Sequence, residues 1–316
     1  KRDILHRVNF QEESLPVTYL GLPLITKKLT KVDCIPLVER ITARANSWVS
    51  KALSFAGCLQ LVKATLVSMQ TYWCSTFWLL MSIVKECEHV LRKFLWGGHG
   101  WGKVKWAEAC NPFMEGGLGI RDLKTWNKAL LLKQVWSLFS WSWKKILLMR
   151  PLAKEHLIYK CGNGELFSLF DPWLQGESVH ALYGHRVIYD TGLDRHARVK
   201  DMIWEGDTID LQQRVRHIPI STDLDSIHWD IEGEKFSTSR AWHDIRGKSS
   251  RVAWHDVVLH PMRILKHEFS LWLAIRGAYR TKDKLLAVGV VQSALCSFHC
   301  GETESIDHIF FQCPYS

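Results

Sequence analysis

The sequence predicts a mainly α-helical protein with a small α+β middle segment, and three observations support this prediction. Apolar residues recur at helical spacing through most of residues 33–148. Between residues 161 and 235, short apolar runs alternate with glycine, aspartate and proline, which is typical of small strands and loops. Helical spacing returns after residue 237, and the last 21 residues hold three of the nine cysteines. We therefore expect a helical region at 1–160, a connector rich in short strands and loops at 161–235, and a helical C-terminal module at 236–316.

The expected helical region starts with an extended segment at residues 15–25, where two prolines and a glycine exclude a helix. Asp33 follows as the expected N-cap of a first helix, with Pro36 in its first turn. One face of this helix carries Leu37, Ile41, Ala45 and Trp48. A long helical stretch is expected at 54–80, and its apolar face carries Leu59, Val62, Leu66 and Met69. A third helix is expected at about 82–96, before a pair of glycines.

The densest glycine cluster, at residues 116–119, is expected to form a turn that leads into a helix at 123–148. Glycines can also cradle a phosphate group, since they let backbone N–H groups approach an anion. The cluster is not a Walker motif, because no Gly-Lys-Ser/Thr follows it. The helices expected in the C-terminal module lie at 239–245, 254–259, 268–276 and 281–288.

Length and composition indicate a folded protein with more than one core. The chain has 316 residues, 47% of them apolar, which is enough for two or three domains. It contains no run of eighteen apolar residues, so we expect no membrane span. No cleavable signal peptide is recognisable, and six of the nine cysteines are scattered through apolar stretches. We therefore expect a protein of the nucleus or cytoplasm, in a reducing compartment, and not a secreted one.

The cysteines near the C-terminus form the most specific pattern in the chain, which reads Cys296-x3-Cys300-x7-His308-x4-Cys313. Structural zinc sites are typically built from thiolate and imidazole ligands in two close pairs that are separated by a loop. The sequence therefore predicts that these four residues hold one structural zinc ion.

The residues around both pairs support this prediction. Gly301 permits a tight turn at the first pair, and a short helix at 304–312, stopped by Pro314, would present the second. The segment is too short to bury a core of its own, so ligand bonds would supply folding energy. Two alternatives stay open, namely ordinary buried thiols and redox or disulfide chemistry. The second ligand is also open between His299 and Cys300, and Cys300 is favoured because two thiolates hold zinc more tightly.

The positive charge is concentrated in the first half of the chain. The net charge is +5 for residues 1–87, +8 for 88–160 and −4 for 161–316. The tryptophans interleaved with the most basic block are Trp96, Trp101, Trp106, Trp126, Trp136, Trp141 and Trp143. Cations neutralise phosphates and aromatic rings stack on unpaired bases, so their combination favours a nucleic-acid surface. The alternative is that these tryptophans fill a helical core. The candidate nucleic-acid-binding residues are Arg92, Lys93, Lys103, Lys105, Arg121, Lys124, Lys128 and Lys133.

Several stretches, taken in order, resemble one family. They are TYLGLPL (18–24), LVERITARANSWVSKALSFAG (37–57), YW (72–73), FLWGG (94–98), EGGLGIRDL (115–123), NKALLLKQVW (127–136) and DPWL (171–174). In this order they resemble the polyprotein of plant non-LTR (LINE-type) retrotransposons, downstream of the polymerase palm. Further stretches resemble the reverse-transcriptase zinc-binding domain of the same elements, namely FSTSRAW (236–242), Trp254, FSLWLAIRGAYRTKDKL (269–285) and the closing cysteine segment.

The resemblance implies a thumb-like helical region at 1–160 that grips nucleic acid, and a zinc-binding domain at 236–316 closed by a zinc knuckle. The chain departs from the family at three places. It has Cys-x3-Cys where the family usually has Cys-x2-Cys. Cys58 stands where the family usually has arginine, and Phe113 stands where lysine is common. The latter two changes remove cations that would contact phosphate.

Reverse transcriptases polymerise with two metal ions held by palm aspartates. The expected Phe/Tyr-x-Asp-Asp signature is absent, no Asp-Asp pair occurs, and the chain begins at Lys1 near where the palm would end. We therefore predict a non-catalytic fragment with no catalytic residue, RNA and/or DNA as partners, and no small-molecule substrate. One alternative is a structural or protein-interaction zinc module without nucleic-acid affinity. Another is part of an active RNA-directed DNA polymerase whose palm lies upstream.

Overall fold

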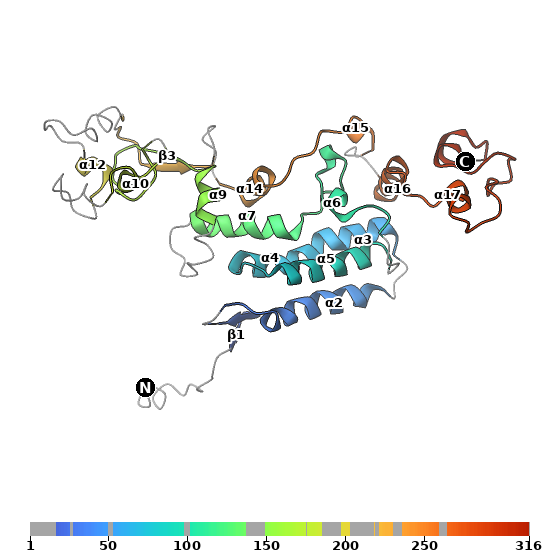
Figure 1. Cartoon of the computed structure of the whole chain (residues 1–316), viewed down its shortest axis with the longest axis horizontal. Coiled ribbons are helices and arrows are strands. Elements are labelled where there is room, and N and C mark those ends of the chain that lie inside the picture. The colour runs from blue at the N-terminus through green and yellow to red at the C-terminus, as the bar shows by residue number, and fades with distance from the viewer. Residues whose placement is uncertain are drawn as a thin grey trace. The chain divides into compact units, whose positions relative to one another are not determined.

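The computed structural model describes residues 17–25, 28–49, 53–97, 102–136, 149–174, 176–184, 197–202, 218, 221–229, 236–258 and 264–315. It divides into two compact units. The first comprises Lys1–Asn127 together with Arg246–Ser316, and the second comprises Lys128–Ile245. Among the described residues, helices outnumber strands in both units, and the strands form two small sheets (Figure 1), so the predicted fold class is confirmed.

The first unit begins with a β-hairpin of strands β1 (Val17–Tyr19) and β2 (Leu22–Leu24). The strands are antiparallel, with Val17 opposite Leu24. Both turn residues have positive φ, 50° at Leu20 and 80° at Gly21, as expected in a tight two-residue hairpin turn. The extended segment predicted at 15–25 is confirmed for residues 17–25, and its first two residues lie outside the described ones.

Helix α2 (Ile35–Val49) follows a 3-10 turn at Val32–Cys34. The prediction that Asp33 is the N-cap is wrong, because Asp33 lies inside this turn. Its carboxylate accepts hydrogen bonds from the N–H and hydroxyl of Thr30, at 2.7 and 2.6 Å. The Thr30 hydroxyl also accepts from the Asp33 N–H at 3.4 Å, the reciprocal pairing of a capping box. The buried face of α2 carries Leu37, Ile41 and Ala45 as predicted, and Trp48 is half-buried.

The stretch predicted at 54–80 is a composite helix that ends earlier than expected. It consists of α3 (Phe55–Leu61), a π-helical turn (Val62–Leu66) and α4 (Val67–Thr76). Ser54 caps its start, since its hydroxyl accepts the Gly57 N–H at 3.2 Å. A π turn in effect inserts one residue into a helix. The buried face therefore passes to Gln70, which is 1% exposed, and the predicted core residue Met69 is only half-buried.

Asn127 explains why this helix stops at Thr76. Its side-chain amide donates to the carbonyls of Cys74 and Phe77, at 2.7 and 2.8 Å, and its oxygen accepts the Leu79 N–H at 3.0 Å. Backbone groups at the end of α4 thus find partners outside the helix. Asn127 is buried on α7 (Leu123–Trp136), 48 residues from Leu79, so no local sequence signal marks this end.

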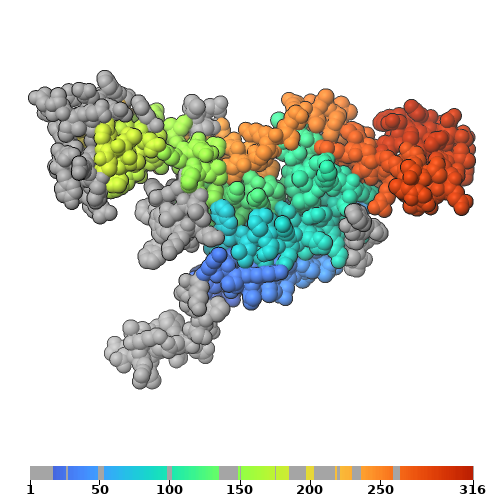
Figure 2. All heavy atoms as spheres, viewed as in Figure 1, coloured from blue at the N-terminus to red at the C-terminus, as the bar shows by residue number. Residues whose placement is uncertain are grey.

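Helix α5 (Met81–Leu95) completes the helical group and confirms the third predicted helix. It packs along α2 and also contacts α3. Its buried positions include Ile83, Cys87, Leu91 and Leu95, one residue per helical turn. Figure 2 shows the atoms of these helices, coloured blue to blue-green, packed together as one mass.

The glycine cluster forms a turn after α6 (Trp106–Ala109) and a 3-10 turn (Phe113–Glu115). A Cβ on Gly117 would lie 2.0 Å from the carbonyl oxygen of Asn111, so glycine is required here by close backbone packing. This confirms the predicted turn into α7. The predicted continuation of α7 through residues 137–148 lies outside the described residues.

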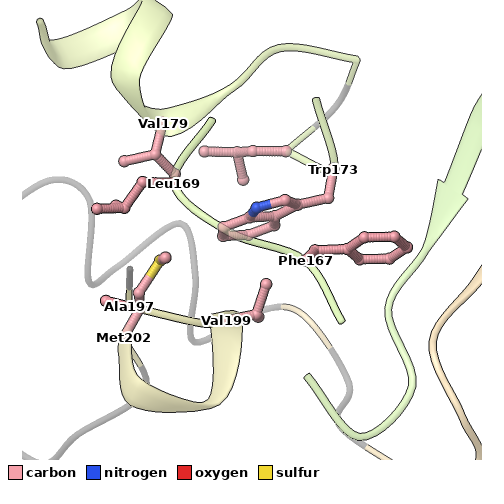
Figure 3. Packing of buried hydrophobic residues seen from close by; sticks show 8 residues of the cluster. Phe167, Leu169, Trp173, Val179, Ala197, Val199 and Met202 are labelled. Atoms are coloured by element: carbon pink, nitrogen blue, oxygen red, sulfur yellow. The ribbon is translucent and has the colours of Figure 1, made fainter. Parts of the chain in front are cut away.

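The second unit contains short helices and one two-stranded sheet. Besides the part of α7 from Lys128 onward, the described helices are α9 (Arg150–Lys154), α10 (Val179–Tyr183), α12 (Val199–Met202) and α14 (Thr238–Ile245). Strands β3 (Ile158–Lys160) and β4 (Ser226–His228) are antiparallel, with Tyr159 opposite Ile227. Figure 3 shows its core, which is made of Phe167, Leu169, Trp173, Leu174, Val179, Ala197, Val199 and Met202. Among the described residues of 161–235 lie the strand β4, the short helices α10 and α12, and loops, as expected of a small α+β segment.

Asp225 organises the loop that precedes this core. Its carboxylate accepts the N–H groups of Gly162, Gly164 and Leu166 at 2.6, 2.9 and 2.7 Å. Burial by itself would raise the pKa of Asp225, but these N–H groups outweigh it and hold the pKa below its usual value. A single carboxylate thus fixes the backbone of the glycine-containing turn.

The C-terminal part of the first unit contains α15 (His255–Val258), α16 (Leu265–Ile275) and α17 (Lys282–Ala287). Trp272 is fully buried and its indole N–H donates to the Gly116 carbonyl at 2.9 Å. Arg246 forms a two-pronged ion pair with Glu115, and both side chains are nearly buried. These contacts join segments more than 100 residues apart. Among the described residues, none of the helices combines the length and hydropathy needed to cross a membrane.

Candidate metal centre

The first ligand pair lies on a short hairpin that is stabilised by backbone hydrogen bonds. Glu304 N–H donates to the Ala294 carbonyl at 2.7 Å, and Cys296 N–H donates to the Glu302 carbonyl at 2.9 Å. At the tip, the chain reverses through His299, with φ of 56°, and Gly301, with φ of 91°. Gly301 therefore supplies a positive φ at the tight turn that the sequence predicted here.

The second pair lies on the last helical turns of the chain. Ser305 starts them, since its hydroxyl accepts the His308 N–H at 3.0 Å. The helix begins at residue 306, two residues later than predicted. Its π-helical part spans His308–Gln312. Cys313 N–H donates to the His308 carbonyl at 2.7 Å. The π turn therefore brings Cys313 back toward His308 across five residues.

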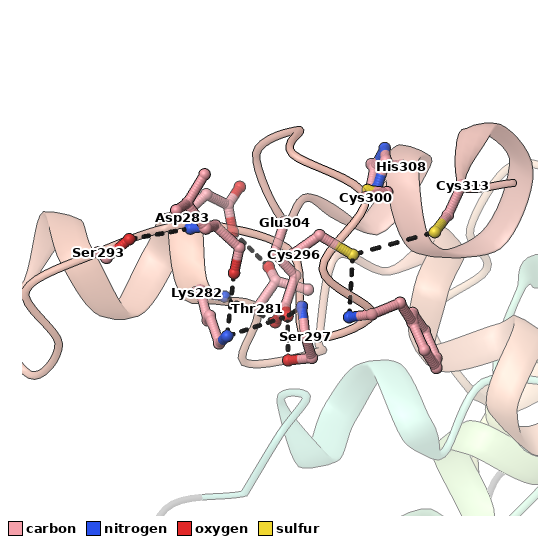
Figure 4. Close-up of polar contacts among 12 residues, drawn as sticks. Thr281, Lys282, Asp283, Ser293, Cys296, Ser297, Cys300, Glu304, His308 and Cys313 are labelled. Carbon is pink, nitrogen blue, oxygen red and sulfur yellow. Dashed lines mark hydrogen bonds and ion pairs between the residues drawn. The ribbon is translucent and has the colours of Figure 1, made fainter. Parts of the chain in front are cut away.

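The four side chains converge (Figure 4), and their candidate ligand atoms all lie within 4.8 Å of one another. Cys296 Sγ lies 3.9 Å from Cys313 Sγ, and Cys300 Sγ lies 3.0 Å from His308 Nε2. Tetrahedral zinc with bonds of about 2.3 Å to sulfur separates two thiolates by about 3.8 Å. A disulfide needs about 2.05 Å between sulfurs. The spacing of Cys296 and Cys313 therefore fits a shared metal ion and not a covalent bond.

Within this cluster, the pKa of Cys296 is shifted in the opposite direction to those of the six cysteines outside it. The Glu302 N–H acts to lower the pKa of Cys300, but burial and the neighbouring Cys296 and Cys313 thiols raise it. Burial acts to raise the pKa of Cys296, but the Phe298 N–H, which donates to its Sγ at 3.4 Å, and the neighbouring ligand side chains lower it to about 7. By contrast, burial raises the pKa of Cys34 and Cys161 to about 11 and that of Cys87 to about 12. The pKa values of Cys58, Cys74 and Cys110 are raised for the same reason. A metal ligand must be a thiolate, and Cys296 is the thiol most suited to that role.

The two candidates for the second ligand lie in different surroundings. Cys300 belongs to the convergent group, whereas His299 is exposed and does not. Among the described residues, this group is the one set of three or more metal-binding side chains close enough to share an ion.

Glu304 connects the hairpin to α17 and was not singled out by the sequence. Its buried carboxylate accepts the Lys282 N–H at 3.1 Å and the Ser297 N–H at 3.0 Å, together with the Ser297 hydroxyl. Burial acts to raise the pKa of Glu304, but these donors and the charge of Lys282 hold it below its usual value. Because Ser297 follows Cys296 directly, Glu304 positions the backbone next to a candidate ligand. Its partners lie 7 and 22 residues away, so no local motif reveals it.

The eight candidate nucleic-acid-binding residues divide between the two units. Arg92, Lys93, Lys103, Lys105, Arg121 and Lys124 belong to the first unit, and Lys128 and Lys133 to the second. Arg121 is half-buried over the Trp126 ring, 4.0 Å from its centroid, and Lys93, Lys105, Lys124 and Lys133 are exposed.

The tryptophans that the structure describes in this basic block serve packing. Trp96 is 2% exposed, Trp126 is 5% exposed and Trp106 is half-buried. Buried rings cannot stack on a base without rearrangement, so the core interpretation holds for Trp96 and Trp126. Trp101, Trp141 and Trp143, and the side chain of Trp136, lie outside the described residues.

Comparison with known proteins adds an independent observation. Residues 236–316 match the family described as zinc-binding in reverse transcriptase. A relative from Arabidopsis thaliana, named "Putative ribonuclease H protein", is 26% identical over an alignment that covers 93% of this chain and 56% of the relative. The chain thus spans little more than half of this curated relative. The family match includes all four residues of the convergent group.

Proposed function

We propose that this chain, a retrotransposon-related protein that carries a reverse-transcriptase zinc-binding domain at residues 236–316, is a nucleic-acid-binding part of a larger polyprotein and is not catalytic by itself. One structural zinc ion, held by Cys296, Cys300, His308 and Cys313, stabilises its C-terminal end. The proposed organisation is a basic helical region at 1–160, a connector at 161–235 and the zinc-binding domain.

The observation that carries the zinc proposal is the composition of the buried side chains. Between residues 289 and 315, the buried residues are Cys296, Glu304, His308 and Cys313. No aliphatic or aromatic side chain in this described stretch is buried, so it has no apolar core of its own. Metal–ligand bonds can replace that core, as they do in small zinc modules that unfold without metal. Four protein ligands also fill a tetrahedral shell, which supports a structural and not a catalytic ion.

Charge supports the nucleic-acid part of the proposal. The zinc-binding domain itself has ten basic and seven acidic residues, a net charge of +3. The acidity of residues 161–316 therefore comes from the connector at 161–235, which has seven basic and fourteen acidic residues. The basic first half and the basic zinc-binding domain both suit a polyanionic partner. The absence of an Asp-Asp pair supports the proposal that polymerase chemistry, if the polyprotein performs it, resides outside this chain.

Metal analysis of the full chain tests the zinc proposal. We expect about one zinc per chain, lost when Cys300 and Cys313 are changed to serine. The matched control is His299→Asn, because asparagine tolerates the positive φ at that position and His299 is the competing ligand. Retention of zinc in Cys300→Ser with loss in His299→Asn would overturn the ligand assignment. Absence of zinc from the wild-type protein would overturn the whole zinc proposal.

Fluorescence anisotropy on a labelled RNA–DNA hybrid across a salt series tests nucleic-acid binding. We expect binding that weakens steeply as salt rises, because phosphate contacts release counterions. Absence of binding at low salt, or binding that ignores salt, would contradict the proposal.

A structural or protein-interaction module without nucleic-acid affinity is the second candidate. It is favoured by apolar side chains left exposed near the metal centre, with Val290 68%, Phe311 71% and Tyr315 69% exposed. The two candidates differ in one result. The second predicts a zinc-loaded, folded chain that does not bind the hybrid at any salt concentration.

A further inference from the structure

A cavity of about 400 Å³ lies in the first unit, where α16 packs against α3. Its lining includes the aromatic residues Phe55, Trp96, Phe269 and Tyr279 and the cations Lys103 and Lys266. This volume is in the range of ligand-binding pockets, which are mostly apolar with a few polar groups. None of the described residues that line it is acidic.

The aromatic residues form a buried floor and accessible walls. Phe269 and Trp96 are 3% and 2% exposed, while Phe55 and Tyr279 are half-buried. Phe55 stacks on Phe269, with ring centroids 5.9 Å apart and planes at 18°. The Lys103 ammonium lies 4.4 Å from the centroid of Phe55 and 5.7 Å from that of Tyr279. A flat ring can therefore reach the two walls if the flexible Lys103 side chain moves aside.

The cations at this cavity are not neutralised by carboxylates among the described residues. Neither Lys103 nor Lys266 forms an ion pair there. Arg280 adds a further positive charge close to Lys103. Such a concentration of like charge beside an apolar pocket is complementary to a ligand that joins an anion to a flat ring.

From these observations we propose that the cavity binds one unpaired nucleotide of a nucleic-acid strand. The base enters between Phe55 and Tyr279, and Lys103 and Lys266 contact its phosphate. This inference rests on the proposed nucleic-acid function and specifies a site for it. It assigns a role to Tyr279 and Lys266, which the charge pattern of residues 88–160 did not include.

A hybrid duplex with one bulged nucleotide, compared with the same duplex carrying an abasic bulge, tests the site in the zinc-loaded full chain. Stacking of one base typically changes affinity by about fivefold to 150-fold. We expect the wild-type protein to prefer the bulged base by at least about fivefold. Tyr279→Ala should abolish this preference and Tyr279→Phe should retain it, with affinity for the abasic duplex unchanged in both.

Two further variants separate the site from general effects. Ser270→Leu fills the cavity without removing a ring and should also abolish the preference, even if Tyr279→Ala fails to fold. Lys63→Ala is the matched control, because the Lys63 ammonium also lies over a ring, 4.2 Å from the centroid of Phe113, but does not line this cavity. It should keep the preference.

The outcomes distinguish the two proposals. Equal affinity of the wild-type protein for both duplexes overturns the nucleotide site and leaves the nucleic-acid function standing. Binding to neither duplex overturns both. If free nucleoside monophosphate removes the base preference at concentrations equal to those of the duplex, the pocket serves a free nucleotide and not a strand, and the proposal is wrong.

Discussion

Replacing Glu304 with glutamine tests how the metal hairpin is held to α17. The substitution keeps the side-chain length but exchanges one acceptor oxygen for an amide donor. Since the two carboxylate oxygens accept from Lys282 N–H and Ser297 N–H separately, one of these buried donors loses its acceptor. A hydrogen bond to a charged group contributes about 1.5–3 kcal/mol. With the weakened attraction to the Lys282 ammonium, 4.0 Å away, we expect a loss of about 2–3 kcal/mol in local stability.

Hydrogen exchange of the zinc-loaded full chain measures this loss. A decrease of about 2–3 kcal/mol in the free energy of local opening speeds exchange by about 30- to 150-fold at the affected amides. The amides to follow are those of Lys282 and Ser297. The matched control is Glu302→Gln, which makes the same change in charge at an exposed position on the same hairpin. Glu304 does not hold the hairpin as described if the two amides exchange at the wild-type rate in Glu304→Gln. The same conclusion follows if Glu302→Gln speeds their exchange equally.

Three further predictions concern the scaffold. Because the folded-state pKa of Asp225 is lowered, its contribution is complete above the unfolded aspartate pKa of about 3.9 and is lost as pH falls through the folded value. As the pH is lowered, circular dichroism should therefore show a smaller loss of stability in Asp225→Asn than in the wild-type protein. Asp223→Asn, at an exposed position, should lose as much stability as the wild type. Asn127→Ala should cost about 2–4 kcal/mol in urea unfolding, since it strands buried backbone groups, and a cost under about 0.5 kcal/mol would contradict this. Arg246→Lys should lower the free energy of unfolding by about 1–3 kcal/mol in thermal melts, because lysine cannot form a two-pronged pair with Glu115; an unchanged melting temperature would refute that role.

The spacing of apolar residues predicted helices α2 and α5, which pack against each other. In α2 and α5, buried residues repeat once per turn, and a short window of sequence contains that information. The elements that the sequence missed depend on distant partners. The end of α4 is set by Asn127, and the shift of burial from Met69 to Gln70 follows from a π turn that has no local signature.

The candidate metal centre shows the same division. The four clustered side chains could be selected from spacing, because metal ligands are chemically distinctive and few residue types qualify. Glu304 could not be selected, since a lone glutamate is common and its partners are set by tertiary packing. Positive φ values on both sides of Cys300, at His299 and Gly301, accompany the x3 spacing of the first pair.

The first unit is assembled from two segments that the ribosome makes far apart in time. Residues 1–127 emerge first, and Arg246–Ser316 follow only after the whole second unit has been synthesised. A nascent chain at that stage exposes the side of α3 against which α16 will pack. Completion of this unit is therefore a late, long-range folding step, and chaperone binding during synthesis would act on that apolar surface. Any expression boundary placed between the two segments leaves the same surface uncovered.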